Sequence, residues 1–296
     1  MSIITTWPAV PSRLFAVYAS LADSENGETR DRFASWATPS SLASRGGGET
    51  GEASSAILNQ TLQEARRLGL VNEADGRLMV GDVPRRKTTG GDREPEFRSF
   101  MRHVLLSPER AEAAGHAAFA IALAWFLGRD PRHPLEFSQA PQRLLSEEIG
   151  ELASATELTN ADNYRNFLWW VRYLGYATFV GHGSSRRVVP DPTRAIDEAL
   201  PEVFDGADAL EIEQFIAALA TTLPVLEDGA ARTAVENARA APSADRDNLS
   251  IATSLALLRL SERGTIRLES VADARARILN YGSETVRVSR VRRGKK

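Results

Sequence analysis

The stretch “LQEARRLGLVNEADGRLMV”, residues 62–80, decides the fold that we predict for this chain. Its leucines recur at helical spacing up to Gly69, and a glycine is a common C-terminal stop for a helix. An apolar pair, a turn containing Asp75-Gly76 and a second apolar run follow, which predicts a β-hairpin. Two shorter helical patterns precede the stretch. Three helices followed by a hairpin predict a winged helix-turn-helix domain.

The same ending recurs further along the chain. “LWWVRYLGY” (168–176) aligns without a gap with “LQEARRLGL” (62–70), and a strand–turn–strand pattern follows each copy. “LLRLSERGTIRLE” (257–269) is a looser third copy. The repeat period is longer than that of solenoid repeats, which favours tandem domains. The alternative is that L-x-x-x-x-x-L-G is simply a common way for a helix to end before a strand.

We therefore predict a mostly α-helical protein with small β-hairpins, built from tandem winged helix-turn-helix domains. Residues 1–82 form the first domain and residues 97–194 the second. A polar linker that contains Gly and Pro, residues 83–96, separates them. An acidic helical segment, 195–237, leads to a possible third winged-helix-like domain with a basic C-terminal tail, 238–296.

Composition and charge limit the possible functions. The chain has 296 residues and no cysteine, which excludes disulfides, thiolate nucleophiles and Cys-type zinc sites. Neither a signal peptide nor a bilayer-spanning run is visible, so we expect a cytoplasmic protein without a membrane partner. The net charge of −3 does not indicate a nucleic-acid-binding protein. However, residues 195–231 contain nine acidic and no basic residues, and the last ten residues contain six basic and no acidic ones.

A glycine-rich stretch, “ASRGGGETGEASS” (43–55), has two glycines at the spacing of a Walker A phosphate-binding loop. Such a loop follows a strand and places Lys and then Ser or Thr after its second glycine. Here a helical pattern precedes the stretch, and Glu52 and Ala53 occupy those two positions. We therefore expect no bound nucleotide. We interpret the stretch as a flexible turn, with Ser54 or Ser55 capping the third helix.

No pattern of catalytic residues is visible. The four histidines lack metal-ligand spacing, and no Gly-x-Ser-x-Gly, His-Glu-x-x-His or dinucleotide fingerprint is present. His116 lies on an apolar helical pattern and is expected in a core or an interface. His182 lies in the predicted hairpin of the second domain, where it contacts solvent or phosphate. We therefore expect no enzyme, no cofactor and no metal.

The candidate binding residues lie on polar helix faces. In a helix-turn-helix the recognition helix turns its polar face into the major groove. Amide side chains can bind adenine and guanidiniums can bind guanine or phosphate. On the third helix, opposite its leucines, the candidates are Asn59, Gln60, Gln63, Arg66 and Arg67. Simple solvation of this face is the alternative.

The equivalent helix of the second domain is expected to bury Tyr164, Phe167, Val171 and Leu174. This leaves Arg165 and Arg172 on its polar face as candidate DNA contacts, together with the hairpin residues Arg186 and Arg187. Exposed tryptophans are commoner in protein interfaces than in groove recognition, so Trp169 and Trp170 are predicted to contact a protein. The linker residues Arg85, Arg86 and Lys87 and the basic tail can contact phosphates, and the tail can equally be a solvated end.

Both ends of the chain resemble the G component of the Dpd clusters. These bacterial clusters insert 7-deazaguanine bases into DNA and restrict DNA that lacks them. The resemblance rests on Pro11-Ser12, on “PSSL” (39–42), on Leu68-Gly69-Leu70 and on “LRLSERGTIRLESVADARARIL” (258–279). One proline of the family's “PPSL”-like turn is replaced. The resemblance implies a role in DNA recognition or assembly within a multi-protein defence system, without catalytic residues.

Two functions follow from these observations. The first is a non-catalytic accessory protein that binds double-stranded DNA through tandem winged helices, together with other proteins of a DNA-modification and antiviral defence system. The alternative is an assembly subunit whose winged helices bind protein in a defence or chromosome-organising complex. The sequence pI of about 5.9, the acidic segment and the tryptophan pair favour this alternative.

Overall fold

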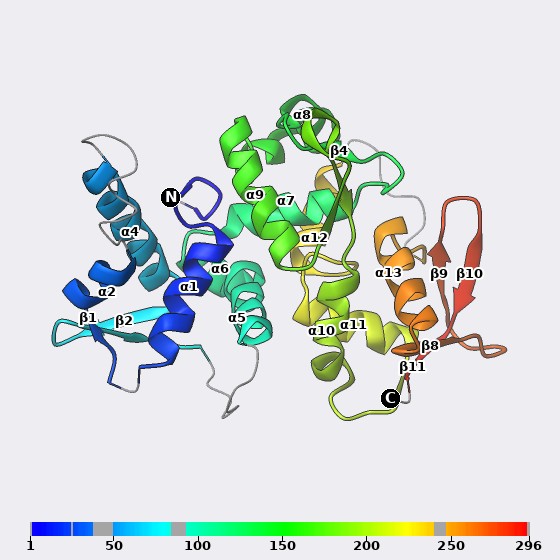
Figure 1. Cartoon of the computed structure of the whole chain (residues 1–296). Coiled ribbons are helices and arrows are strands. Elements are labelled where there is room, and N and C mark those ends of the chain that lie inside the picture. Colours follow the sequence, from blue (N-terminus) through cyan, green and yellow to red (C-terminus); the bar gives the residue numbers. More distant parts are fainter. Residues whose placement is uncertain (1, 25, 38–49, 84–92, 240–246, 295–296) are drawn as a thin grey trace.

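The computed structural model describes residues 2–24, 26–37, 50–83, 93–239 and 247–294, without the side chains of residues 36 and 50–55. The fold is mostly helical with small antiparallel sheets, as the sequence predicts. The N-terminal elements and the C-terminal sheets lie at opposite ends of the molecule, with α5, α7, α9 and α10 between them (Figure 1).

The first unit combines helices with a three-stranded sheet of order β1-β3-β2. Asp75 and Gly76, which join β2 to β3, both have positive φ (52° and 72°), as a tight two-residue hairpin turn requires. The elements are α1 (Pro11–Ala22), β1 (Glu28–Thr29), α2 (Arg30–Ala37), α4 (Thr50–Arg67), β2 (Val71–Ala74) and β3 (Arg77–Val80).

Helix α4 begins earlier than the sequence suggested. It starts at Thr50, so the prediction that Ser54 or Ser55 caps it was wrong. Residues 43–49 of the glycine-rich stretch lie outside the described residues. The predicted apolar face of α4 comprises Leu58, Leu62, Ala65 and Leu68; the last three are buried, and Leu58 is half-buried against the core.

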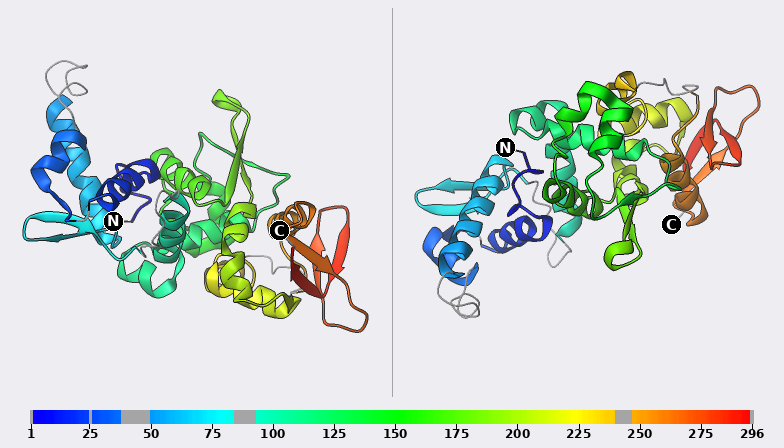
Figure 2. Two further views of the ribbon diagram at one scale, coloured as in Figure 1. Left: turned by 60° about the horizontal axis from the view of Figure 1, so that its bottom comes forward. Right: turned by 90° about the horizontal axis from the view of Figure 1, so that it is seen from above.

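The second unit repeats this order of elements. Two connecting helices, α5 (Glu94–Leu106) and α6 (Pro108–Ala113), lead into it. Its sheet has the order β4-β6-β5, in which the first strand again pairs with the last. The β5–β6 hairpin projects from the body of the molecule (Figure 2). The elements are α7 (Ala117–Leu127), β4 (Leu135–Glu136), α8 (Gln142–Ile149), η1 (Gly150–Thr156), α9 (Ala161–Tyr173), β5 (Ala177–Val180), η2 (Gly183–Ser185) and β6 (Arg187–Pro190).

The third unit has a sheet of order β7-β11-β8 and an additional hairpin, β9–β10. Strand β7 belongs to the acidic segment 195–237, yet it pairs with β11 of the C-terminal segment, with Leu210 opposite Val291. The sheet therefore joins the two segments that the sequence separated at residue 237. The elements are α10 (Thr193–Phe204), β7 (Ala209–Glu211), α11 (Ile212–Thr222), α12 (Ala230–Ala238), α13 (Ile251–Glu262), β8 (Ile266–Glu269), β9 (Arg277–Asn280), β10 (Thr285–Val288) and β11 (Arg290–Arg293).

The three aligned glycines end their helices with the same backbone geometry. Gly69, Gly175 and Gly264 have φ of 71°, 89° and 74°. In each case the following amide donates a hydrogen bond to the carbonyl five residues earlier, which is the pattern of a Schellman C-cap. These bonds are Leu70 to Ala65 (2.8 Å), Tyr176 to Val171 (2.9 Å) and Thr265 to Leu260 (2.9 Å).

Aromatic side chains connect the first two units in one hydrophobic core. The ring centre of Phe97 on α5 lies 5.4 Å from that of Phe15 on α1 and 5.9 Å from that of Tyr173 on α9. The apolar face predicted for α9 is also buried, and it comprises Tyr164, Phe167, Val171 and Leu174.

None of the described helices combines the length and the hydrophobicity that crossing a membrane requires.

Candidate nucleic-acid interface

The polar face predicted on α4 is turned to the surface, but it is not a free cationic face. Asn59, Gln60 and Gln63 are exposed. The amide oxygen of Asn59 accepts a hydrogen bond from Arg30 Nη2 (2.8 Å). The amide oxygen of Asn59 is therefore engaged within the protein, whereas Gln60 and Gln63 have exposed side chains with no such bond among the described residues.

Both arginines at the end of α4 are paired with carboxylates of the protein itself. Arg66 forms an ion pair with Glu73 of β2. Arg67 Nη2 lies 3.3 Å from Glu64 Oε1 and 3.4 Å from each ring nitrogen of His116. These contacts compensate the positive charges of the two arginines, which would otherwise attract a phosphate. Arg66 and Arg67 therefore already have carboxylate partners within the protein.

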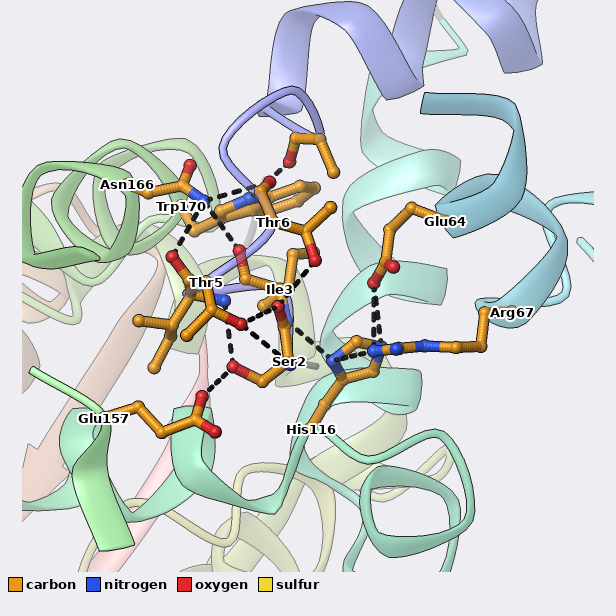
Figure 3. Close-up of polar contacts among 12 residues, drawn as sticks. Ser2, Ile3, Thr5, Thr6, Glu64, Arg67, His116, Glu157, Asn166 and Trp170 are labelled. Atoms are coloured by element: carbon orange, nitrogen blue, oxygen red, sulfur yellow. Dashed lines mark hydrogen bonds and ion pairs between the residues drawn. The ribbon is translucent and has the colours of Figure 1, made fainter. Parts of the chain in front are cut away.

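Arg67, although exposed, reaches a polar junction between the first two units in which Glu64 and His116 are buried (Figure 3). His116, which precedes α7, is fully buried, and its Nδ1 accepts a hydrogen bond from the amide of Ile3 (2.9 Å). Since Nδ1 accepts, the neutral ring carries its proton on Nε2, which lies 3.3 Å from Glu64 Oε1. The position of His116 confirms its expected place in a core or an interface.

The environment of this junction keeps His116 neutral. Burial, together with the positive charge of Arg67, lowers the pKa of the imidazole to about 3. Burial also raises the pKa of the neighbouring Glu64 carboxyl. Neither side chain is accessible to a substrate, because Glu64 is only 3% exposed and His116 is not exposed at all. We interpret the pair as a structural junction.

Two side chains of α9 hold the N-terminal segment against this junction (Figure 3). Asn166 Nδ2 donates to the carbonyls of Ile3 (2.6 Å) and Ile4 (3.2 Å). Trp170 Nε1 donates to the carbonyl of Ala9 (3.0 Å), and the indole is fully buried. The prediction that Trp170 contacts a protein partner was therefore wrong. The residue lies on the apolar side of α9, next to Phe167 and Val171, and the N-terminal segment covers it.

The neighbouring Trp169 has the opposite environment. Its side chain is 38% exposed and contacts two phenylalanines that the sequence analysis did not select. The ring centres of Trp169 lie 5.6 Å from Phe137, which follows β4, and 5.7 Å from Phe179 on β5. The two phenylalanine rings are 5.2 Å apart. We call Phe137, Trp169 and Phe179 the aromatic cluster.

Two of the predicted DNA-binding arginines lie against this aromatic cluster. The guanidinium carbon of Arg172 is 4.9 Å from the ring centre of Phe179, and that of Arg186 is 4.9 Å from the ring centre of Phe137. Both distances are typical of cation–π contacts. Among the described residues, the arginines of α9 and of the β5–β6 hairpin that form ion pairs are Arg165 and Arg187, not Arg172 or Arg186. Both therefore present an uncompensated charge.

The other two arginines predicted here are paired. Arg165 forms an ion pair with Asp162, three residues earlier on α9. Arg187 Nη2 lies 3.2 Å from Glu136 Oε1. His182 is exposed in the loop between β5 and β6, as expected for a hairpin residue. Phe137 was missed because its loop has no periodicity. Phe179 could have been found, because it lies in a predicted strand, where it and the next residue, Val180, point to opposite faces.

The basic tail is neither a solvated end nor a free phosphate-binding arm in its described part. Residues 290–293 form the central strand β11 of the third sheet. Arg290 Nη2 lies 2.6 Å from Glu211, and Arg292 Nε lies 2.9 Å from Glu269. On the helix equivalent to α9, Arg259 of α13 pairs with Asp191 of the second unit (2.8 Å). The linker residues Arg85, Arg86 and Lys87 lie outside the described residues.

The part of the chain that the structure describes offers little for metal or substrate chemistry. It contains no group of three or more His, Asp or Glu side chains that could hold a metal ion. A shallow hollow of about 550 Å³ beside η1 is lined mainly by apolar groups, among them Ile149, Leu152 and Ala238. Glu151 is its one charged lining residue.

Comparison with known proteins gives one assignment. A family model described as DpdG-like matches residues 1–274. No curated protein and no solved structure matches the chain.

Proposed function

The chain belongs to the DpdG-like family, and on this premise we propose that it is a non-catalytic, DNA-binding accessory component of the Dpd DNA-modification system. The observation that carries the proposal is the repeated order of helix, strand, helices and two strands, with the first strand of each sheet paired to the last. This is the order of a winged helix-turn-helix, whose last helix before the hairpin enters the major groove.

Among the three units, we propose the second as the one that contacts DNA. Its helix α9 and its projecting hairpin carry Arg172 and Arg186, whose charges are uncompensated by any described carboxylate. At the position that corresponds to Arg172, the first unit has Arg66, which is paired with Glu73, and the third unit has Ser261. Phosphate contacts need free cationic groups on the surface.

We propose a non-catalytic role because the histidine–carboxylate pair that the described residues form in the interior is closed to solvent. His116 and Glu64 contact each other but face neither solvent nor a cavity. A general base must reach the proton that it removes, directly or through one water molecule.

A salt-series titration tests the proposal. We expect the wild-type protein to bind duplex DNA with an affinity that falls steeply with salt, since phosphate contacts release counterions. The variant Arg172→Ala/Arg186→Ala is expected to bind more weakly and to lower the slope of log K against log salt by about one for each lost contact. The matched control, Arg263→Ala/Arg267→Ala, removes two exposed charges from the third unit and is expected to bind like the wild type.

The outcomes separate the parts of the proposal. Absence of binding at about 50 mM salt contradicts a DNA-binding function. Binding that is lost in the control but kept in the Arg172→Ala/Arg186→Ala variant moves the DNA site to the third unit. Loss of binding in Gln60→Ala/Gln63→Ala moves it to α4 instead.

A second candidate function is that of an assembly subunit, and the exposed acidic side chains of the third unit favour it. Asp197 and Glu202 on α10, and Asp205 and Asp208 after it, are exposed. They suit a basic protein surface and repel DNA. Co-purification with another component of the system, lost when these four residues are changed to Ala, supports this function. Co-purification that persists in the variant argues against it.

A further inference from the structure

The aromatic cluster is an exposed apolar site beside the polar face of α9. Trp169 is 38% exposed, although two aromatic rings, Phe137 and Phe179, lie within 5.7 Å of its centre. The three rings come from three elements that the fold brings together, namely the chain after β4, helix α9 and strand β5. Leaving an indole in water costs free energy that a binding partner can recover.

The charge around the cluster restricts the partner. Arg172 lies over the Phe179 ring and Arg186 over the Phe137 ring, so two guanidiniums that pair with no carboxylate of the described residues lie against the aromatic cluster. Glu136, the residue before Phe137, is paired with Arg187. The site is therefore cationic and rich in π surface. It fits a partner that is anionic and also presents flat π surfaces, and nucleic acid has both properties.

Intact B-form DNA cannot use this site fully. In a duplex each base is covered on both faces by its neighbours and offers only its edges in the grooves. A base without a partner strand offers its face, and aromatic side chains and arginine planes bind bases by stacking on that face. Resting on the DNA-binding function proposed above, we propose that the aromatic cluster stacks on an unpaired base. The second unit then prefers DNA with a single-stranded segment to a continuous duplex.

Two DNA ligands test the inference, a blunt duplex and the same duplex with a short single-stranded overhang. We expect the wild-type protein to prefer the overhang by about tenfold, since one stacked base contributes about that much. Trp169→Ala is expected to lose the preference and to bind the blunt duplex within about twofold of the wild type. Trp169→Phe keeps a ring at this position and is expected to keep most of the preference.

A matched control uses another exposed tryptophan. Trp7 is 53% exposed and lies outside the aromatic cluster. Trp7→Ala is expected to retain the preference for the overhang. Stacking also quenches indole fluorescence, so the overhang is expected to quench the wild type and Trp7→Ala, but to quench Trp169→Phe much less. Circular dichroism at the titration temperature confirms that each variant is folded.

The results distinguish this inference from the function on which it rests. Equal affinity of the wild type for both ligands, or a preference that survives in Trp169→Ala, overturns the inference and leaves duplex binding intact. Absence of binding to either ligand overturns both. Equal affinity combined with Trp169-dependent co-purification of another Dpd component assigns the aromatic cluster to a protein partner and also overturns the inference.

Discussion

Lowering the pH is expected to destabilise this protein through His116. The imidazole is fully buried and accepts a hydrogen bond from the amide of Ile3 at Nδ1. Protonation at Nδ1 would place two N–H groups against each other in the interior. In the unfolded chain the ring is free to take up the proton at its ordinary pKa of 6.5.

The sign and the size of the effect follow from the two pKa values. The pKa of His116 in the folded protein is about 3, so between pH 6.5 and about 3 the unfolded state binds more protons. Stability is therefore lost as the pH falls through this range, at about 1.4 kcal/mol for each pH unit well below 6.5. This amounts to about 2 kcal/mol between pH 7 and pH 5. Glu64 opposes the loss, because its pKa is raised and its protonation favours the folded state as the pH falls.

Urea denaturation at pH 7, 6 and 5 measures the effect. Comparison with His116→Gln separates His116 from the carboxylates, since Gln can accept from Ile3 and donate to Glu64 without titrating. The wild type is expected to lose about 2 kcal/mol more than His116→Gln over this range. The control His182→Gln replaces an exposed histidine and is expected to follow the wild type. Equal pH dependence of the wild type and His116→Gln would refute the reasoning.

Three further predictions concern stability, and each is checked by thermal and urea denaturation. Glu198→Ala removes the carboxylate that the buried Arg98 and Arg102 share (2.8 and 2.6 Å), so the free energy of unfolding is expected to fall by about 3–5 kcal/mol. A fall of less than about 1 kcal/mol would contradict this prediction. Gly175→Ala places a Cβ 3.0 Å from the backbone nitrogen of Ala195, so it is expected to destabilise the protein more than Gly206→Ala does. Gly206 has a similar positive φ, but no atom lies within 4 Å of its added Cβ. Equal losses of stability in the two variants would contradict this prediction. Trp170→Phe removes a buried hydrogen bond and is expected to lower the free energy of unfolding by about 1–3 kcal/mol. Trp169→Phe is expected to lower it by less than about 0.5 kcal/mol. The reverse order would contradict the assignment of Trp170 as the buried residue.

The sequence by itself determined the local elements of this protein. The stop at Gly69, the turn at Asp75-Gly76 and the buried face of Leu62, Ala65 and Leu68 are all as predicted. Each depends on residues close together in the chain. Helical spacing places leucines on one face, and a positive φ favours glycine, whatever the rest of the molecule does. The recurrence of the pattern therefore also predicted that the C-caps at Gly175 and Gly264 would be alike.

Only the tertiary structure decided which polar and aromatic groups remain available at the surface. Trp169 and Trp170 are neighbours in sequence, yet Trp170 is buried and donates a hydrogen bond to the carbonyl of Ala9, 161 residues away, whereas Trp169 is exposed. Arg67 is directed to His116, and residues 290–293 become a central strand, because partners distant in sequence meet in the fold. The periodicity of the sequence indicates which face of a helix is apolar. Which side chains form ion pairs and which are buried depends on contacts with segments distant in sequence, and no local pattern predicts those contacts.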